Sequence, residues 1–224
     1  MKSEVLRYLG RKNQEVPEGL SGMIDECIAL MHDTAAPRHI SREFKVSPGA
    51  GCIALDGTGI LLPGKDIARH LRGCDRAVLM AATLGAQTDA LIQKWGRADL
   101  TRALVLDACA TRLTEEYCDE IEREIRAQAT AFGFMAARRF SPGYGDLPLD
   151  IQPRILDVLN ACRQIGLTCT ESLILLPRKS VTAIIGLGEK LSLPPGGCAG
   201  CAMNHTCDFR KDGSTNECPR ADKE

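Results

Sequence analysis

The sequence is poor in aromatic residues, with one tryptophan, three tyrosines and five phenylalanines among 224 residues. Proteins that bind single-stranded nucleic acid stack bases on aromatic side chains, so this scarcity argues against that class. An excess of charge of one sign is also lacking, because 28 Lys and Arg residues face 29 Asp and Glu residues and leave a formal net charge of -1. We therefore expect no nucleic acid and no anionic membrane as a partner.

Long apolar runs are lacking as well. No stretch approaches the roughly 18 consecutive apolar residues of a membrane-spanning helix. The N-terminal MKSEVLRYLGRKNQEVPEG has no apolar run followed by a small-residue cleavage site, so we expect no signal peptide. A cytoplasmic location follows as an expectation. There the 11 cysteines would be mostly reduced thiols or metal ligands rather than disulfides.

Apolar periodicity and turn residues predict interspersed helices and strands. Helices are expected over 20–32, 64–73, 87–96, 99–129 and 151–166, strands over 39–46, 77–85 and 180–187, and a hairpin over 51–64. A buried helix also fits the apolar run 77–85. Because there is neither a Gly-rich phosphate loop nor a regular strand–helix repeat, we predict an α+β fold. It would have a twisted mixed or antiparallel sheet flanked by helices, in one main domain.

The composition changes near residue 190, where LSLPPGGC begins a stretch rich in proline, glycine and cysteine. Such a stretch has too few apolar residues for a core of its own. We therefore predict a main domain over residues 1–190 and a short Cys-rich appendage over residues 191–224.

The stretch 138-RRFSPGYGD-146 places rigid and permissive backbone side by side. Pro142 fixes its φ angle and Gly143 tolerates conformations that other residues avoid, so a ligand could approach this turn closely. Arg139 supplies a planar fork of donors for a carboxylate or phosphate, and Tyr144 supplies a flat face with a hydroxyl. These residues suit a small amphipathic anion, and they also suit an ordinary surface turn with a buried tyrosine.

The pattern Arg-x-x-Pro-Gly-Tyr resembles the S-adenosylmethionine-binding turn in the activation (reactivation) domain of cobalamin-dependent methionine synthase. Upstream, ALVLDACATRLTEEYCDEI resembles the long helix that precedes the turn in that family. Downstream, GLTCTESLILLPRKSVTAIIGL resembles its Thr-Glu-Ser segment, proline and closing Ser-Val strand. The resemblance covers roughly residues 100–188.

The resemblance implies a role for each residue of the turn. Arg139 would hold the carboxylate of the ligand's methionine moiety, and the backbone around Ser141 would bond polar groups. Pro142 and Gly143 would shape the turn, and Tyr144 would line the pocket. It also implies that the domain presents S-adenosylmethionine to a bound cobalamin. An external electron donor would reduce cob(II)alamin to cob(I)alamin, which would then accept the methyl group. The protein would mainly position the ligand, so we expect no catalytic acid or base.

The chain departs from the family at three places. Gly145 and Asp146 stand where the family usually has proline after the tyrosine, and Asp146 could place a carboxylate near the sulfonium. The Ser-Val strand leads into the Cys-rich tail instead of a further segment with tyrosines. The corrinoid-binding signature Asp-x-His-x-x-Gly is absent from the sequence. We therefore expect a free-standing activation protein that meets a corrinoid-binding methionine synthase, or a related corrinoid protein, in trans.

The tail 196-GGCAGCAMNHTCDFRKDGSTNECPR-220 contains a C-x-x-C pair and two further cysteines. Cys198, Cys201, Cys207 and Cys218 could together bind zinc or an iron–sulfur cluster. His205 is an alternative ligand in place of Cys218. A flexible reduced tail, or a redox pair without metal, fits the same residues.

Three functions therefore compete. The first is S-adenosylmethionine binding for the reductive methylation of cob(II)alamin, as a component of a methyltransferase system. The second is a metal-containing electron-transfer partner of a corrinoid protein that does not use S-adenosylmethionine. The third is an adaptor that covers a corrinoid domain and binds no small molecule.

Overall fold

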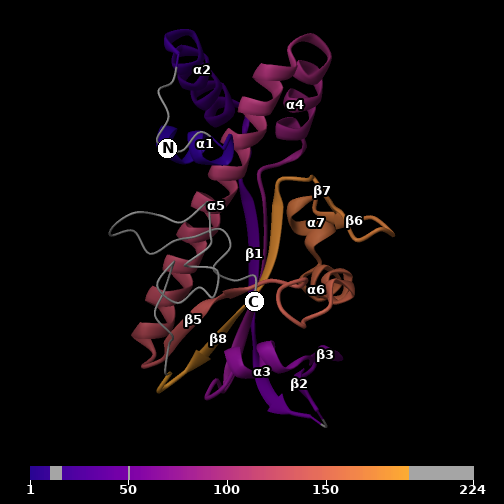
Figure 1. Ribbon diagram of the computed structural model, residues 1–224. Helices are drawn as coiled ribbons and strands as arrows, with labels where there is room; N and C mark the ends of the chain where they lie inside the picture. Colours follow the sequence, from indigo (N-terminus) through magenta and orange to yellow (C-terminus); the bar gives the residue numbers. More distant parts are fainter. Residues whose placement is uncertain (11–16, 50, 192–224) are drawn as a thin grey trace. The chain divides into compact units, whose positions relative to one another are not determined.

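The computed structural model describes residues 1–10, 17–49 and 51–191, and its elements follow one another along the chain as Figure 1 labels them. The helices are α1 (Lys2–Tyr8), α2 (Glu18–Thr34), α3 (Lys65–His70), α4 (Ala86–Ala98), α5 (Leu100–Ala131), the 3-10 turn η1 (Leu149–Ile151), α6 (Gln152–Leu159) and α7 (Ala161–Ile165). The strands are β1 (Arg38–Pro48), β2 (Cys52–Leu55), β3 (Ile60–Pro63), β4 (Arg76–Thr83), β5 (Met135–Phe140), β6 (Thr168–Cys169), β7 (Leu175–Leu176) and β8 (Ser180–Gly188).

The chain forms two compact units. The first contains Met1–His39, Ala82–Asp119 and Cys162–Val181. The second contains Ile40–Ala81, Glu120–Ala161 and the described residues from Thr182 onward. Helix α5 contributes its residues up to Asp119 to the first unit and the rest to the second.

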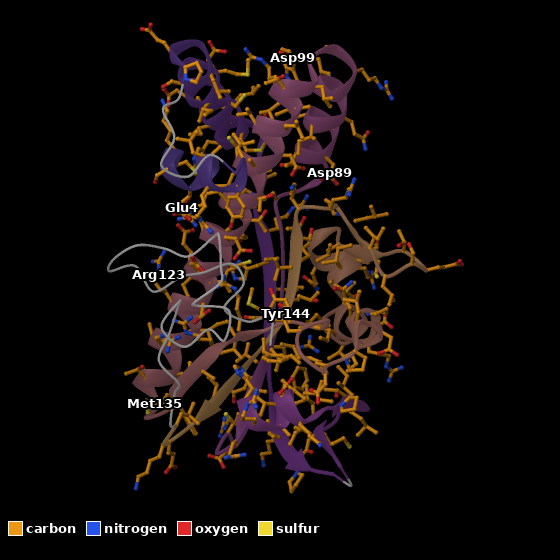
Figure 2. The ribbon with its side chains drawn as sticks, in the orientation of Figure 1. Glu4, Asp89, Asp99, Arg123, Met135 and Tyr144 are labelled. Carbon is orange, nitrogen blue, oxygen red and sulfur yellow. The ribbon has the colours of Figure 1, made fainter. Side chains whose placement is uncertain are left out.

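The first unit has a helical core. Apolar residues recur at three- and four-residue steps along α2 and α5, which gives each helix one buried face. The buried residues of this core are Val5, Ile24, Cys27, Met31, Leu84, Val105, Leu106, Ala108, Cys109, Ala110 and Leu113. Asp99, labelled in Figure 2, caps the start of α5 as expected, because its carboxylate accepts the Arg102 N–H at 3.0 Å.

The second unit contains most of a six-stranded sheet with the strand order β3-β2-β1-β4-β8-β5. Two of its interior strands, β4 and β8, are buried along nearly their whole length, which explains why both are continuous apolar runs in the sequence. The run 77–85, which also suited a helix, is therefore mostly strand.

The sheet is antiparallel. The pairs β1–β2, β2–β3 and β5–β8 are antiparallel by their registers. For β1 and β4, the Val46 N–H donates to the Asp75 carbonyl and the Ala36 N–H to the Leu84 carbonyl. For β4 and β8, the Asp75 N–H donates to the Leu187 carbonyl and the Leu84 N–H to the Lys179 carbonyl. The predicted α+β class is thus confirmed, with the antiparallel form of the sheet.

Several element boundaries differ from the sequence prediction. Helix α4 does not end at Gly96 but continues to Ala98, because one glycine lowers helix stability without breaking the hydrogen bonds. The helix expected over 151–166 is divided at Asn160, which adopts a left-handed conformation with φ 53°. Strand β5, helix α1 and the β6–β7 hairpin were not anticipated.

Among the described residues, no helix combines the length and the apolar character needed to cross a membrane. None of the seven cysteines in this part of the chain is joined in a disulfide. The boundary predicted at residue 190 stays a prediction, because residues 192–224 lie outside the described part.

Candidate functional site

The Ser-Pro-Gly-Tyr-Gly segment forms a compact turn directly after β5, in the second unit (Figure 2). The Tyr144 N–H donates to the Ser141 carbonyl at 3.1 Å, the Leu147 N–H to the Tyr144 carbonyl at 3.0 Å, and the Gly143 N–H to the Leu147 carbonyl at 2.9 Å. Gly143 has a φ of 88° and Gly145 a φ of 50°, values that residues with a Cβ atom rarely adopt. The two glycines therefore allow the chain to close this turn upon itself.

Arg139 projects from β5 next to a carboxylate of α5. Its Nη1 donates to Glu122 Oε2 at 3.2 Å, and both side chains are mostly buried, with exposed fractions of 16% and 14%. The other oxygen, Glu122 Oε1, accepts from Arg126 Nη2 at 2.8 Å. Two guanidinium groups thus share one carboxylate, so the three side chains carry a formal charge of +1. The guanidinium of Arg139 is therefore held by a carboxylate of α5.

An aromatic cluster lies beside the turn. The Phe140 ring contacts Tyr144 edge-on, with centroids 6.0 Å apart, and contacts the His70 ring at 5.0 Å. His70 Nε2 also lies 2.9 Å from the Arg138 carbonyl, which can only accept, so this nitrogen carries the proton. Burial lowers the pKa of His70 and outweighs the Arg138 carbonyl and the Glu122 carboxylate, which both raise it.

Asp146 connects the end of the turn to the start of α3. Its carboxylate accepts the Lys65 N–H at 2.6 Å and the Asp66 N–H at 3.0 Å, and Asp66 in return accepts the Asp146 N–H at 3.3 Å. The backbone N–H groups of Asp66 and Lys65 hold the pKa of Asp146 below its usual value. The structure thus gives Asp146 a helix-capping role, and its placement near a sulfonium stays a prediction.

The five predicted binding residues lie together at the end of β5 and in the turn. Pro142 is buried, Gly143 is exposed, and Arg139, Ser141 and Tyr144 are partly buried. Their assignment to a ligand remains a prediction. The four predicted metal ligands, Cys198, Cys201, Cys207 and Cys218, and the alternative ligand His205, lie outside the described residues. In the part of the chain that is described, no three His, Cys, Asp or Glu side chains are grouped as a metal would require.

Sequence reasoning missed the residues that surround the turn, namely Glu122, Arg126, His70 and Phe140. Glu122 and Arg126 are spaced i,i+4 on a long helix, a spacing typical of solvated ion pairs. His70 stands alone in its segment, with nothing to indicate that it packs against residues 68 or more positions away. The spacing of Glu122 and Arg126 was the one available signal, and it does not distinguish a buried pair from an exposed one.

No family model and no curated protein matches this sequence. Its fold is similar to that in a crystal structure of the MetH reactivation domain bound to AdoHcy, with a TM-score of 0.61 and a sequence identity of 17%. The similarity covers 84% of this chain and 72% of that chain. At this identity the likeness establishes the fold alone.

Proposed function

We propose that this protein binds S-adenosylmethionine at the 139–144 turn and supports the reductive methylation of cob(II)alamin on a separate corrinoid protein. The corrinoid protein would be a methionine synthase or a related methyltransferase, and the chain would act in trans as a component of that system. Two facts support the proposal together: the fold is similar to the MetH reactivation domain bound to AdoHcy, and the Arg-x-x-Pro-Gly-Tyr sequence forms a closed turn beside the ion pairs of Glu122 with Arg126 and Arg139.

The cluster around Arg139 is the observation on which the proposal depends. The amino-acid end of S-adenosylmethionine carries a carboxylate, and the contact with Glu122 holds the guanidinium of Arg139 near the end of β5, where the turn begins. A guanidinium binds a carboxylate well because its donors are planar and fixed in orientation. Arg139 would bind the ligand's carboxylate while retaining its contact with Glu122.

The other residues of the turn would complete the ligand's surroundings. Gly143 is exposed and has no Cβ atom, so a ligand can come close to its backbone. Backbone groups around Ser141 would bond polar atoms of the ligand, and Pro142 would keep the turn in one conformation. The Tyr144 ring, held edge-on against Phe140, would supply a flat apolar face.

The chain's contribution is to position the ligand. When bound, S-adenosylmethionine would supply an electrophilic methyl group to a reduced cobalamin on the partner protein, with the electron coming from an external donor. The site residues described above hold and orient the ligand's amino-acid end, and none of them needs to transfer a proton. AdoHcy is S-adenosylmethionine without that methyl group, so a site that binds one can present the other.

Titration with S-adenosylmethionine by isothermal calorimetry tests the proposal. The wild-type protein should bind, and Arg139→Ala should lower the affinity by at least about tenfold, the effect of losing one hydrogen bond to a charged group. Arg123→Ala is the matched control, because this arginine of α5 is 72% exposed and should leave affinity unchanged. Absence of binding by the wild-type protein, or full affinity in Arg139→Ala, would contradict the proposal.

A further inference from the structure

The position of Glu122 beside Arg139 is not explained by the proposed binding role of the turn. Glu122 is an acidic residue beside the arginine that would have to bind a carboxylate, and its side chain is 14% exposed. Each of its oxygens bonds a different guanidinium, Arg126 at 2.8 Å and Arg139 at 3.2 Å. A mostly buried carboxylate with a cation at each oxygen has a fixed orientation.

The same contacts fix the strand that carries Arg139. Arg126 Nη1 donates to the Ala136 carbonyl at 2.7 Å, at the point where the register of β5 against β8 shifts. Within the same shift, between Ala136 and Arg139, His70 Nε2 donates to the Arg138 carbonyl. The backbone on the N-terminal side of Arg139 is therefore held by two side chains, and its guanidinium is held by Glu122.

We propose that Glu122 is a positioning residue for carboxylate recognition, which orients the guanidinium of Arg139 toward the amino-acid end of the ligand. This inference rests on the proposed function and assigns a role to a residue outside the turn.

A competing role would give the opposite result. If Glu122 occupied Arg139 in place of the ligand, removing its charge would release the arginine and tighten binding. If Glu122 only stabilised the fold, removing its charge would weaken every ligand alike. The three roles are separable by comparing S-adenosylmethionine with its decarboxylated analogue, which keeps the sulfonium and the nucleoside but lacks the carboxylate.

The experiment uses calorimetric titration of the full chain with both compounds. Glu122→Gln should weaken binding of S-adenosylmethionine roughly tenfold, because that is the effect of losing one hydrogen bond to a charged group. The same variant should bind the decarboxylated analogue with unchanged affinity. Glu122→Asp keeps the charge but shortens the reach to Arg139, so it should give a smaller loss with the same selectivity. Glu124→Gln, at an exposed position of the same helix, should change neither affinity.

Three outcomes with the variants would overturn the inference while the proposed function stands: unchanged affinity for S-adenosylmethionine, tighter binding of it, or an equal loss for both compounds. If Glu122→Gln does not fold, Glu122→Asp decides by the same criteria. Failure of the proposed function itself would be visible before any substitution, because the wild-type protein would bind neither compound, and the inference would then be wrong as well.

Discussion

At the scale of single residues, the neutral form of His70 is built into the second unit. Its ring packs on Phe140, and the one N–H of the neutral ring, at Nε2, donates to the Arg138 carbonyl. Because burial lowers its pKa below the ordinary 6.5, the folded protein binds a proton here less readily than the unfolded chain does. Ionisation of this one side chain is thus linked to the stability of the strand that leads into the turn.

That linkage predicts a pH dependence with a definite sign. A group with a lowered folded pKa contributes stability above its unfolded pKa and loses it as pH falls toward the folded pKa. The free energy of unfolding should therefore decrease below about pH 6.5. Urea denaturation of the wild type and of His70→Gln between pH 7.5 and pH 5 measures this, and the variant should lack this part of the decrease. His32→Gln, at an exposed position in the first unit, should behave as wild type. An identical pH dependence in His70→Gln and the wild type would contradict the prediction.

The turn could be predicted from the sequence and the contact between Glu122 and Arg139 could not, for a physical reason. Proline, glycine and arginine have special backbone or donor properties, so Arg139, Pro142 and Gly143 stand out wherever they occur. A glutamate on a helix has no such property until its partner is known. Arg139 is 17 positions away, across the loop between α5 and β5, and that contact depends on tertiary structure.

At the scale of elements, the start of α3 depends on the end of the turn. Helix α3 has six residues, too few to be stable by itself, and its first N–H groups are bonded by Asp146. The residue before it, Gly64, has φ 120° and ψ 150°, a conformation that is essentially confined to glycine. A Cβ atom on Gly64 would lie 2.9 Å from the carboxyl carbon of Asp146.

Gly64→Ala should therefore separate α3 from the turn. The strained backbone alone should lower the free energy of unfolding by about 1–3 kcal/mol. Because the Asp146 carboxylate would have to move, the turn should also become less ordered and binding of S-adenosylmethionine should weaken. Urea denaturation and calorimetric titration measure the two effects. Gly22→Ala, inside α2, is the control: no atom outside the adjoining backbone lies within 4 Å of a Cβ built there, and alanine favours a helix more than glycine does, so this variant should lose neither stability nor affinity. Full stability in Gly64→Ala would show that the backbone adapts at little cost.

Most elements followed from periodicity, and the exceptions have local causes. Strand β4 and strand β8 were evident because both of their faces are buried. Strand β5 was missed because its register shift between Ala136 and Arg139 interrupts the alternation of buried and exposed residues, and because two of its six residues are arginines. The break at Asn160 was missed because asparagine is only one of several residues tolerated in the left-handed conformation, and helix periodicity continues on both sides.

At the scale of the whole molecule, every described residue that the proposed site uses belongs to one compact unit. His70 and Asp66 come from its Ile40–Ala81 segment, and Glu122, Arg126 and residues 139–146 come from its Glu120–Ala161 segment. The α+β class followed from the order of the elements, whereas the division into two units did not, because α5 contributes to both and its apolar pattern runs through without interruption.

Since residues 139–146 and the described side chains that contact them lie before residue 192, we predict that removing residues 192–224 leaves ligand binding intact. We expect the truncated chain to keep the wild-type melting temperature within a few degrees and the wild-type affinity for S-adenosylmethionine.

If the four tail cysteines carry an electron-transferring metal, the same truncation should lower the rate at which a corrinoid partner is reductively methylated. Anaerobic absorption spectra and metal analysis of the full chain, beside the truncated one, identify the metal. Loss of ligand affinity on truncation would contradict the assignment of the site to the turn, whereas stoichiometric zinc in a colourless full chain would exclude electron transfer by the tail.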